Sequence, residues 1–316
     1  MQISWRQYLT LKLAKRNAIF SLGISVGKHT HYVVGLVKQG AEVYWAHACQ
    51  FDITSFKSEF SLWIKANNLA GTPTYISYTE SYYQLLQVDR PDVEENEVHT
   101  ALQWPLKELL TINKEVAYDY FDLPVQISGQ HKINTVAIEY HHIESMSQLM
   151  LDLHLDLKQI VVEEIATCEL VHSHSEAVLT LVQELSGEIC LTIIKDNRLY
   201  MTRRLRGFDN LGQFSPDELR MGIIESLCIQ IQRSLDYFSN QLRQPPIKHI
   251  FVRLPIDHQD IIAEDIEKVI DMPVSLLTPA IAMKIDININ DFSLNALGAA
   301  MIALHKSNSR STHEAA

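Results

Sequence analysis

The sequence predicts an α/β protein with two similar lobes and an α+β subdomain inserted into the first of them. Both halves open with three strand-like apolar runs, at residues 18–27, 31–38 and 42–50 and again at residues 177–183, 188–195 and 198–206. Helical spacing and further strands then follow each set in the same order. With 316 residues the chain is long enough to bury two cores. Duplicated lobes of this kind place a ligand cleft between them.

Charge and composition exclude several classes of protein. The chain is 47% hydrophobic and 21% charged, and its net charge of −11 excludes nucleic acid as a partner, because phosphates require a basic face. Cys49, Cys168, Cys190 and Cys228 form no CxxC pair, which predicts reduced thiols. No apolar run reaches the ~18 residues that a membrane span requires, so we expect a cytoplasmic protein.

The first 17 residues form a basic, amphipathic segment. Arg6, Lys12, Lys15 and Arg16 are interspersed with aromatic and leucine side chains. Because Lys12 interrupts the apolar stretch, residues 1–17 lack the apolar centre of a secretory signal. Two interpretations stay open: contact with an anionic membrane surface, and a flap folded onto the protein.

Periodicity assigns the remaining elements of the first lobe. Apolar residues at helical spacing predict a helix over 54–68, and apolar runs predict strands over 74–78 and 83–88. We therefore assign residues 18–88 and 164–176 to the first lobe.

Residues 89–163 are predicted to form the inserted subdomain. Its first helix, over 93–110, has acidic residues in its first turn, and Trp104-Pro105 is expected to break or kink it. The other expected elements are strands over 115–123, 133–140 and 157–163 and a helix over 143–154.

The second lobe is predicted to cover residues 177–305, with a helical subdomain at 213–246. Ser215-Pro216-Asp217-Glu218 predicts a helix start, with a serine cap, a proline at the first position and acids in the first turn. The other expected elements are strands over 247–253 and 273–277 and helices over 259–269 and 292–305. Residues 306–316 are polar, and we expect a flexible tail.

The end of the first strand has the pattern of a phosphate-binding turn. Gly23 and Gly27 stand in a Gly-x-x-x-Gly spacing that lets backbone amides approach a phosphate. Ser25 lies between them, where a carboxylate that directs metal and water would be expected. Glycine is scarce over the whole chain, at 11 of 316 residues, which indicates that other phosphate loops have been lost.

Histidines and arginines form two weaker patterns. His141-His142 and His172-x-His174 lack accompanying Cys/His ligand spacing, so we expect no metal site and interpret them as solvated or locally bonded imidazoles. Arg203-Arg204-x-Arg206 lies at a strand end, where it pairs with acids of the same chain or binds an anion.

Several segments resemble the PilM family of actin-like proteins of type IV pilus assembly, and the related MshI proteins of mannose-sensitive haemagglutinin (MSHA) pili. The most specific match is Ile231–Phe238, which is similar to the family's R-S-L-[ED]-[FY] helix. The other matching segments are residues 93–104, 116–120, 134–138, 161–166 and 292–304. The resemblance covers roughly residues 18–305 and implies the actin/sugar kinase/chaperone ATPase fold.

The nucleotide loops of that family are altered here. Its first loop reads D-I-G with a nearby lysine, and Ser25 and Tyr32 stand at these places. Its second D-I-G loop aligns with Gln183-Glu184-Leu185, so the aspartate and the glycine both change. Phe251–Ile256 replaces its glycine-rich adenosine loop.

These losses predict a pseudo-ATPase. Carboxylates hold hydrated Mg²⁺ and orient water, and glycines let backbone amides reach phosphates. We expect no catalytic residue and no cofactor, and a degenerate nucleotide site at Gly23, Ser25, Gly27, Gln183, Glu184, Gly187 and Leu254. The alternative is a divergent but active ATPase that binds Mg-ATP, with Glu184 or Glu188 as the acid that directs Mg²⁺.

The resemblance also implies a partner, the cytoplasmic N-terminal peptide of a PilN-like inner-membrane protein. The expected groove lies between the first lobe and the inserted subdomain, and its candidate residues are Leu86, Trp104, Tyr118, Tyr120 and Ile138, for which core packing is the alternative. The protein would then act at the cytoplasmic face of the inner membrane, where the pilus assembly ATPase is a second candidate partner. A third hypothesis is membrane tethering through residues 1–17, as in FtsA-like proteins.

Overall fold

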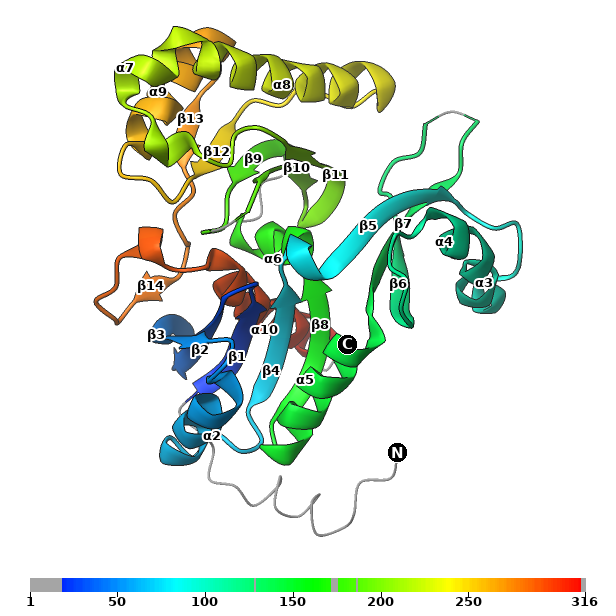
Figure 1. The fold of residues 1–316 in the computed structure, drawn as a ribbon, viewed down its shortest axis with the longest axis vertical. Helices are drawn as coiled ribbons and strands as arrows, with labels where there is room; N and C mark the ends of the chain where they lie inside the picture. Colours follow the sequence, from blue (N-terminus) through cyan, green and yellow to red (C-terminus); the bar gives the residue numbers. More distant parts are fainter. Residues whose placement is uncertain (1–18, 128, 172–175, 186, 314–316) are drawn as a thin grey trace.

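The computed structural model describes residues 19–313 except 128, 172–175 and 186, so the predicted segment 1–17 and His172-x-His174 lie outside it. Its elements build three sheets (Figure 1). The sheet of the first lobe has six strands in the order β14-β3-β2-β1-β4-β8. These are β1 Ile19–Val26, β2 Thr30–Gln39, β3 Glu42–Asp52, β4 Pro73–Tyr78, β8 Asp156–Val162 and β14 Ala282–Met283.

The other two sheets belong to the second lobe and to the inserted subdomain. The second lobe has the order β11-β10-β9-β12-β13, with β9 Val178–Val182, β10 Ile189–Lys195, β11 Arg198–Leu205, β12 Ile250–Arg253 and β13 Val274–Leu276. The subdomain sheet has the order β5-β7-β6, with β5 Tyr83–Asp89, β6 Val116–Asp122 and β7 Lys132–Glu139. The predicted pair of three-stranded meanders is therefore confirmed, as β1–β3 and β9–β11.

Helices cover the sheets and connect them. They are α2 Phe56–Ala66, α3 Glu95–Ala101, α4 Gln103–Leu109, α5 Tyr140–Asp152, α6 Glu163–Leu170, α7 Pro216–Glu218, α8 Ile224–Asp236, α9 Gln259–Ile270 and α10 Leu294–His313. A short turn of helix, η1 Glu80–Tyr82, joins β4 to β5, and another, η5 Ile289–Asp291, precedes α10. Among the described residues, no helix is both long and apolar enough to cross a membrane.

The predicted domain boundaries need several corrections. The strand predicted over 83–88 in the first lobe is β5, which pairs with β7 in the subdomain sheet. The strand predicted over 157–163 closes no subdomain sheet, because β8 pairs with β4 in the first lobe. The last helix packs on the first lobe instead of the second, against β1 and α6, and it continues to His313 through part of the predicted tail. Helix α6, which the sequence analysis missed, lies between the two large sheets and contacts both (Figure 1).

Strand β1 shows how alternation organises the first lobe. Leu22 and Ile24 point to one face, where they join the core under α2 and α5. Ser21 and Gly23, the small residues that alternate with them, face α10. Ser21 Oγ donates to Ala300 O at 2.9 Å. A Cβ on Gly23 would lie 1.9 Å from Ala296 O, so this glycine lets the helix approach the strand. The prediction that Gly23 serves a phosphate is therefore wrong.

Two predicted helix features are confirmed with small changes. The helix expected over 93–110 is broken, but at Leu102, and Pro105 then lies in the first turn of α4, where a missing N–H costs little. Ser215 and Glu218 form a reciprocal capping box. The long helix predicted to follow it is interrupted at Gly222, whose φ is +109°.

Candidate functional site

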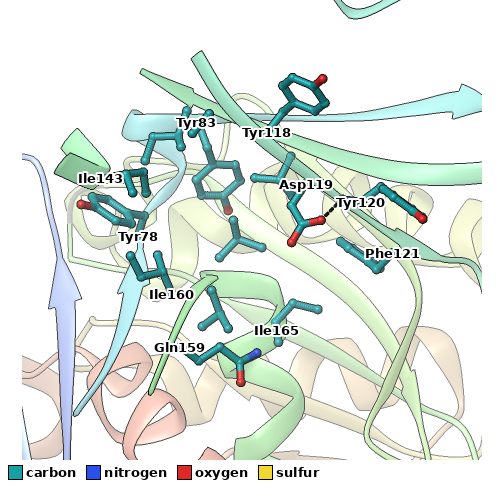
Figure 2. Close-up of a pocket in the computed structure, with 15 residues that line it drawn as sticks. Tyr78, Tyr83, Tyr118, Asp119, Tyr120, Phe121, Ile143, Gln159, Ile160 and Ile165 are labelled. Atoms are coloured by element: carbon teal, nitrogen blue, oxygen red, sulfur yellow. Dashed lines mark hydrogen bonds between the residues drawn. The ribbon is translucent and has the colours of Figure 1, made fainter. Parts of the chain in front are cut away.

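An apolar groove of about 500 Å³ lies between the inserted subdomain and the first lobe. We call it the subdomain groove; it is bordered by residues 117–121 of β6, residues 159–162 of β8, and by Tyr83 and Ile138 (Figure 2). Five consecutive residues of β6 and four of β8 line it, which means that each strand presents its backbone edge rather than one face. Within the described part of the chain both are edge strands, since β6 pairs there only with β7 and β8 only with β4.

The side chains of β6 divide between the groove and a second core. The rings of Tyr118 and Tyr120 turn away from the groove: Tyr118 stacks on His99 of α3, and the hydroxyl of Tyr120 donates to Glu95 Oε1 at 2.9 Å. Ala117, Asp119 and Phe121 alternate with them and point to the groove side, as Figure 2 shows for Asp119. Tyr118 and Tyr120 thus border the groove mainly through their backbone.

Of the other three predicted partner residues, one lines the groove and two lie outside it. Ile138 lines the groove. Leu86 instead packs into the small core beneath α3 and α4, and Trp104 lies outside the groove, 74% exposed, with Lys107 Nζ 5.2 Å from its ring centre. Of the five candidates, the structure therefore brings Tyr118, Tyr120 and Ile138 together and leaves Leu86 and Trp104 apart.

One polar contact at the mouth of the groove concerns the edge of β6. The backbone N–H of Tyr120 donates to the carboxylate of Asp119, its own neighbour, at 2.8 Å (Figure 2). The carboxylate of Asp119 thus accepts a hydrogen bond from a backbone N–H at the strand edge. Without it, this N–H would be free to donate to a further strand.

A second cavity, of about 220 Å³, lies between the first loops of the two lobes. We call it the interlobe cleft. Its acidic lining residues are Glu80, Glu163, Glu184 and Glu188, and its basic ones are Lys28 and His29. The volume lies below the ~300 Å³ at which small-molecule pockets begin.

The predicted nucleotide residues divide between this cleft and the core. Ser25, Gly27, Glu184 and Gly187 line the cleft. The Ser25 hydroxyl accepts a hydrogen bond from Ser293 Oγ at 3.1 Å. The predicted positions that do not reach the cleft are Gly23, Gln183 and Leu254.

Gln183 and Leu254 belong to the packed interior next to Arg253 and not to the cleft. Leu254 is fully buried, and the amide of Gln183 donates to the carbonyls of Gly187 and Asp209. The buried guanidinium of Arg253 donates to Gln183 O at 2.9 Å and to Phe292 O at 2.6 Å. The segment that replaces the adenosine loop of the family thus places an arginine in the core. Its hydrogen bonds connect the second lobe to the segment before α10.

A buried charge cluster, which the sequence analysis did not anticipate, joins the lobes beside the cleft. Arg204 of β11 forms ion pairs with Glu163 and with Glu164 of α6, and its Nε lies 3.2 Å from Glu80 Oε2. The hydroxyl of Tyr83 donates to Glu164 at 2.5 Å. Arg204 therefore pairs with acids of the same chain, as one of the two interpretations of the arginine cluster predicted, whereas Arg203 bonds to Gln230. Two adjacent acids directly after an apolar strand were the signal in the sequence.

Burial dominates the acid–base properties of this cluster. It raises the pKa of Glu163 to about 8, with Arg204 opposing and Glu164 and Glu184 adding to the increase. Burial also raises the pKa of Glu184, whose Oε1 has no hydrogen-bond partner among the described residues.

We expect Glu163→Gln to change how stability depends on pH. Between the ordinary glutamate pKa of 4.5 and about 8, the folded state holds a proton on Glu163 that the unfolded chain has released. The contribution of this group is therefore greatest below pH 4.5 and is lost as pH rises towards 8. Urea titrations from pH 5 to 9 should show the variant gaining stability on the wild type, by at most ~1.4 kcal/mol per pH unit. A constant difference across this range would contradict the assignment.

Two lobes with a cleft between them, and a subdomain inserted in the first, define a protein of the actin-like ATPase fold. The chain is similar to the structure of a PilM–PilN type IV pilus biogenesis complex, with a TM-score of 0.64 and 14% identity over 91% of this chain and 99% of that one. A protein of unknown function with an actin-like ATPase fold from Bacteroides thetaiotaomicron matches with a TM-score of 0.52 and 7% identity, over 90% and 97% of the two chains. No family model matches the sequence, and no curated protein does.

Proposed function

We propose that this chain is an actin-like adaptor of a type IV pilus or related assembly, and that its subdomain groove binds the N-terminal cytoplasmic peptide of a PilN-like inner-membrane protein. One observation carries the proposal: the apolar groove lies between the free edges of β6 and β8. An extended peptide can add to such an edge through its backbone and place alternate side chains in the cavity. The similarity to a PilM–PilN complex supports this choice of partner.

The position of the groove also supports a role in coupling. Its walls come from the first lobe and from the inserted subdomain, so an occupant contacts both and fixes their relation. Binding to a membrane-anchored partner would hold the protein at the cytoplasmic face of the inner membrane, in an MSHA-type system as the resemblance implies.

We further propose that the interlobe cleft is a degenerate nucleotide site. Its small volume and the Ser25–Ser293 hydrogen bond support this proposal. An ATPase that binds Mg-ATP is the second candidate function, because Glu184 and Glu188 both line the cleft, as that hypothesis requires.

Calorimetry separates the two functions. We expect the full-length protein to bind a synthetic peptide of the partner's cytoplasmic N-terminus with a dissociation constant of about 1–50 μM, since ordering a flexible peptide reduces affinity. A scrambled peptide should give no heat, and neither should Mg-ATP or Mg-ADP at millimolar concentration. Absence of peptide binding would refute the adaptor proposal, whereas micromolar nucleotide binding would favour the second candidate.

A further inference from the structure

Three potential metal ligands meet where the inserted subdomain joins the first lobe. Glu139 is the last residue of β7 and occupies the N-cap position of α5, and His141 and His142 lie in the first turn of that helix. Glu139 Oε2 lies 3.2 Å from His141 Nδ1 and 3.9 Å from His142 Nε2. Among the described residues, this set offers three ligand atoms that all lie within 4.8 Å of one another.

These distances suit a tetrahedral metal ion. Zinc bonds to nitrogen and oxygen ligands of about 2.0–2.2 Å place neighbouring ligand atoms of a tetrahedron roughly 3.3 Å apart. The two imidazole rings already lie 3.9 Å apart between centroids, on the same side of the helix start as the carboxylate. Small side-chain rotations would therefore bring all three atoms to bonding distance, with the fourth position left to water.

The neighbouring side chains position one imidazole and leave the counter-ion of the carboxylate exposed. The ring of His142 is held against Tyr82, with centroids 4.8 Å apart. The present counter-ion of Glu139 is Lys114, whose Nζ lies 2.8 Å from Oε2 and whose side chain is 66% exposed. An exposed lysine can move away at little cost.

We propose that Glu139, His141 and His142 form a binding site for a divalent transition metal such as Zn²⁺. The sequence predicted no metal here because the histidines lack Cys/His ligand spacing. In the structure the third ligand is a glutamate that the strand-to-helix turn places beside the histidines. A metal at this turn would tie the end of β7 to the start of α5. It would thereby stiffen the junction that holds Ile138 and Ile143 at the subdomain groove. The proposal does not depend on what the groove binds.

Titration of the metal-stripped, full-length protein with zinc chloride tests the site. We expect one ion to bind with a dissociation constant of about 1–10 μM, weaker than structural zinc sites with four protein ligands and a closed shell. His141→Ala and His142→Ala should each weaken binding at least about tenfold. Lys114→Ala should tighten it, because the competing ammonium is removed.

Two controls separate this site from other histidines. His131→Ala removes an exposed imidazole elsewhere in the subdomain and should leave the affinity unchanged. If His142→Ala does not fold, because its ring packs on Tyr82, Glu139→Gln removes a ligand charge without changing size. Unchanged zinc affinity in His141→Ala and in Glu139→Gln would overturn the proposal, and so would a wild-type dissociation constant above about 100 μM.

Discussion

Replacing Arg204 with methionine is expected to lower the free energy of unfolding by about 3–5 kcal/mol, because it leaves the buried acidic side chains of Glu163 and Glu164 without their partner. The side chain of Glu164 is 2% exposed and that of Glu163 6% exposed, so water cannot replace the guanidinium. Methionine keeps most of the side-chain volume, and the loss therefore reports charge rather than a cavity. Urea denaturation of the purified variant at pH 7 measures it.

Two further variants make the measurement specific. Arg206→Ala removes a neighbouring arginine whose side chain is 90% exposed, and should change stability by less than ~0.5 kcal/mol. Adding Glu164→Gln to Arg204→Met should recover part of the loss, since the orphaned charge is then gone. A double variant as unstable as the sum of the two single ones would show that the cluster is not an energetic unit.

Ala117→Arg is expected to weaken peptide binding by about 100-fold, equivalent to ~2.7 kcal/mol. Ala117 lines the subdomain groove from β6 and lies two residues before Asp119 on the same side of the strand. The new side chain would occupy the cavity and pair with that carboxylate, which excludes an incoming peptide. Fluorescence anisotropy with a labelled peptide measures the affinity, and the melting temperature checks that the variant is folded.

A matched control and a second variant sharpen this result. Trp104→Ala truncates a large exposed side chain outside the groove and should leave the affinity within about twofold of the wild type. Val136→Trp fills the groove from β7 and should act like Ala117→Arg. If Trp104→Ala abolished binding while the two groove variants did not, the peptide would bind on the α3–α4 side, and the assignment of the subdomain groove would be wrong.

The local elements were the predictable part of this molecule. Strands such as β1 and β2 came within two residues of their predicted ends, because a buried strand appears in the sequence as a short apolar run bounded by turn residues. Helix α6 was missed because its sequence lacks the periodic pattern of a helix. Six of its eight residues are buried and these include Glu163, Glu164 and Thr167, so its buried positions do not coincide with apolar residues and leave no helical period of hydrophobicity.

The candidate sites were predicted only in part. Ser25, Gly27, Glu184 and Gly187 do meet in one cleft, since loops that end the first strands of two lobes face each other. Tyr118 and Tyr120 were assigned to the groove by type and position. Strand alternation turns their rings to α3 and gives the groove Ala117 and Asp119 instead, which no property of a single tyrosine reveals.

By itself, the sequence determined most of the strands and helices in their order, and the two-lobe α/β class with an inserted subdomain. These properties follow from periodicity, capping and residue chemistry within short stretches of chain. Only the tertiary structure decided that β6 and β8 leave facing edges around an apolar groove, that Gly23 serves helix packing, and that Arg204 neutralises acids some 40 residues away. Such features depend on contacts between distant segments. The free energy of burial that creates them depends on the whole fold, so no local sequence pattern predicts them.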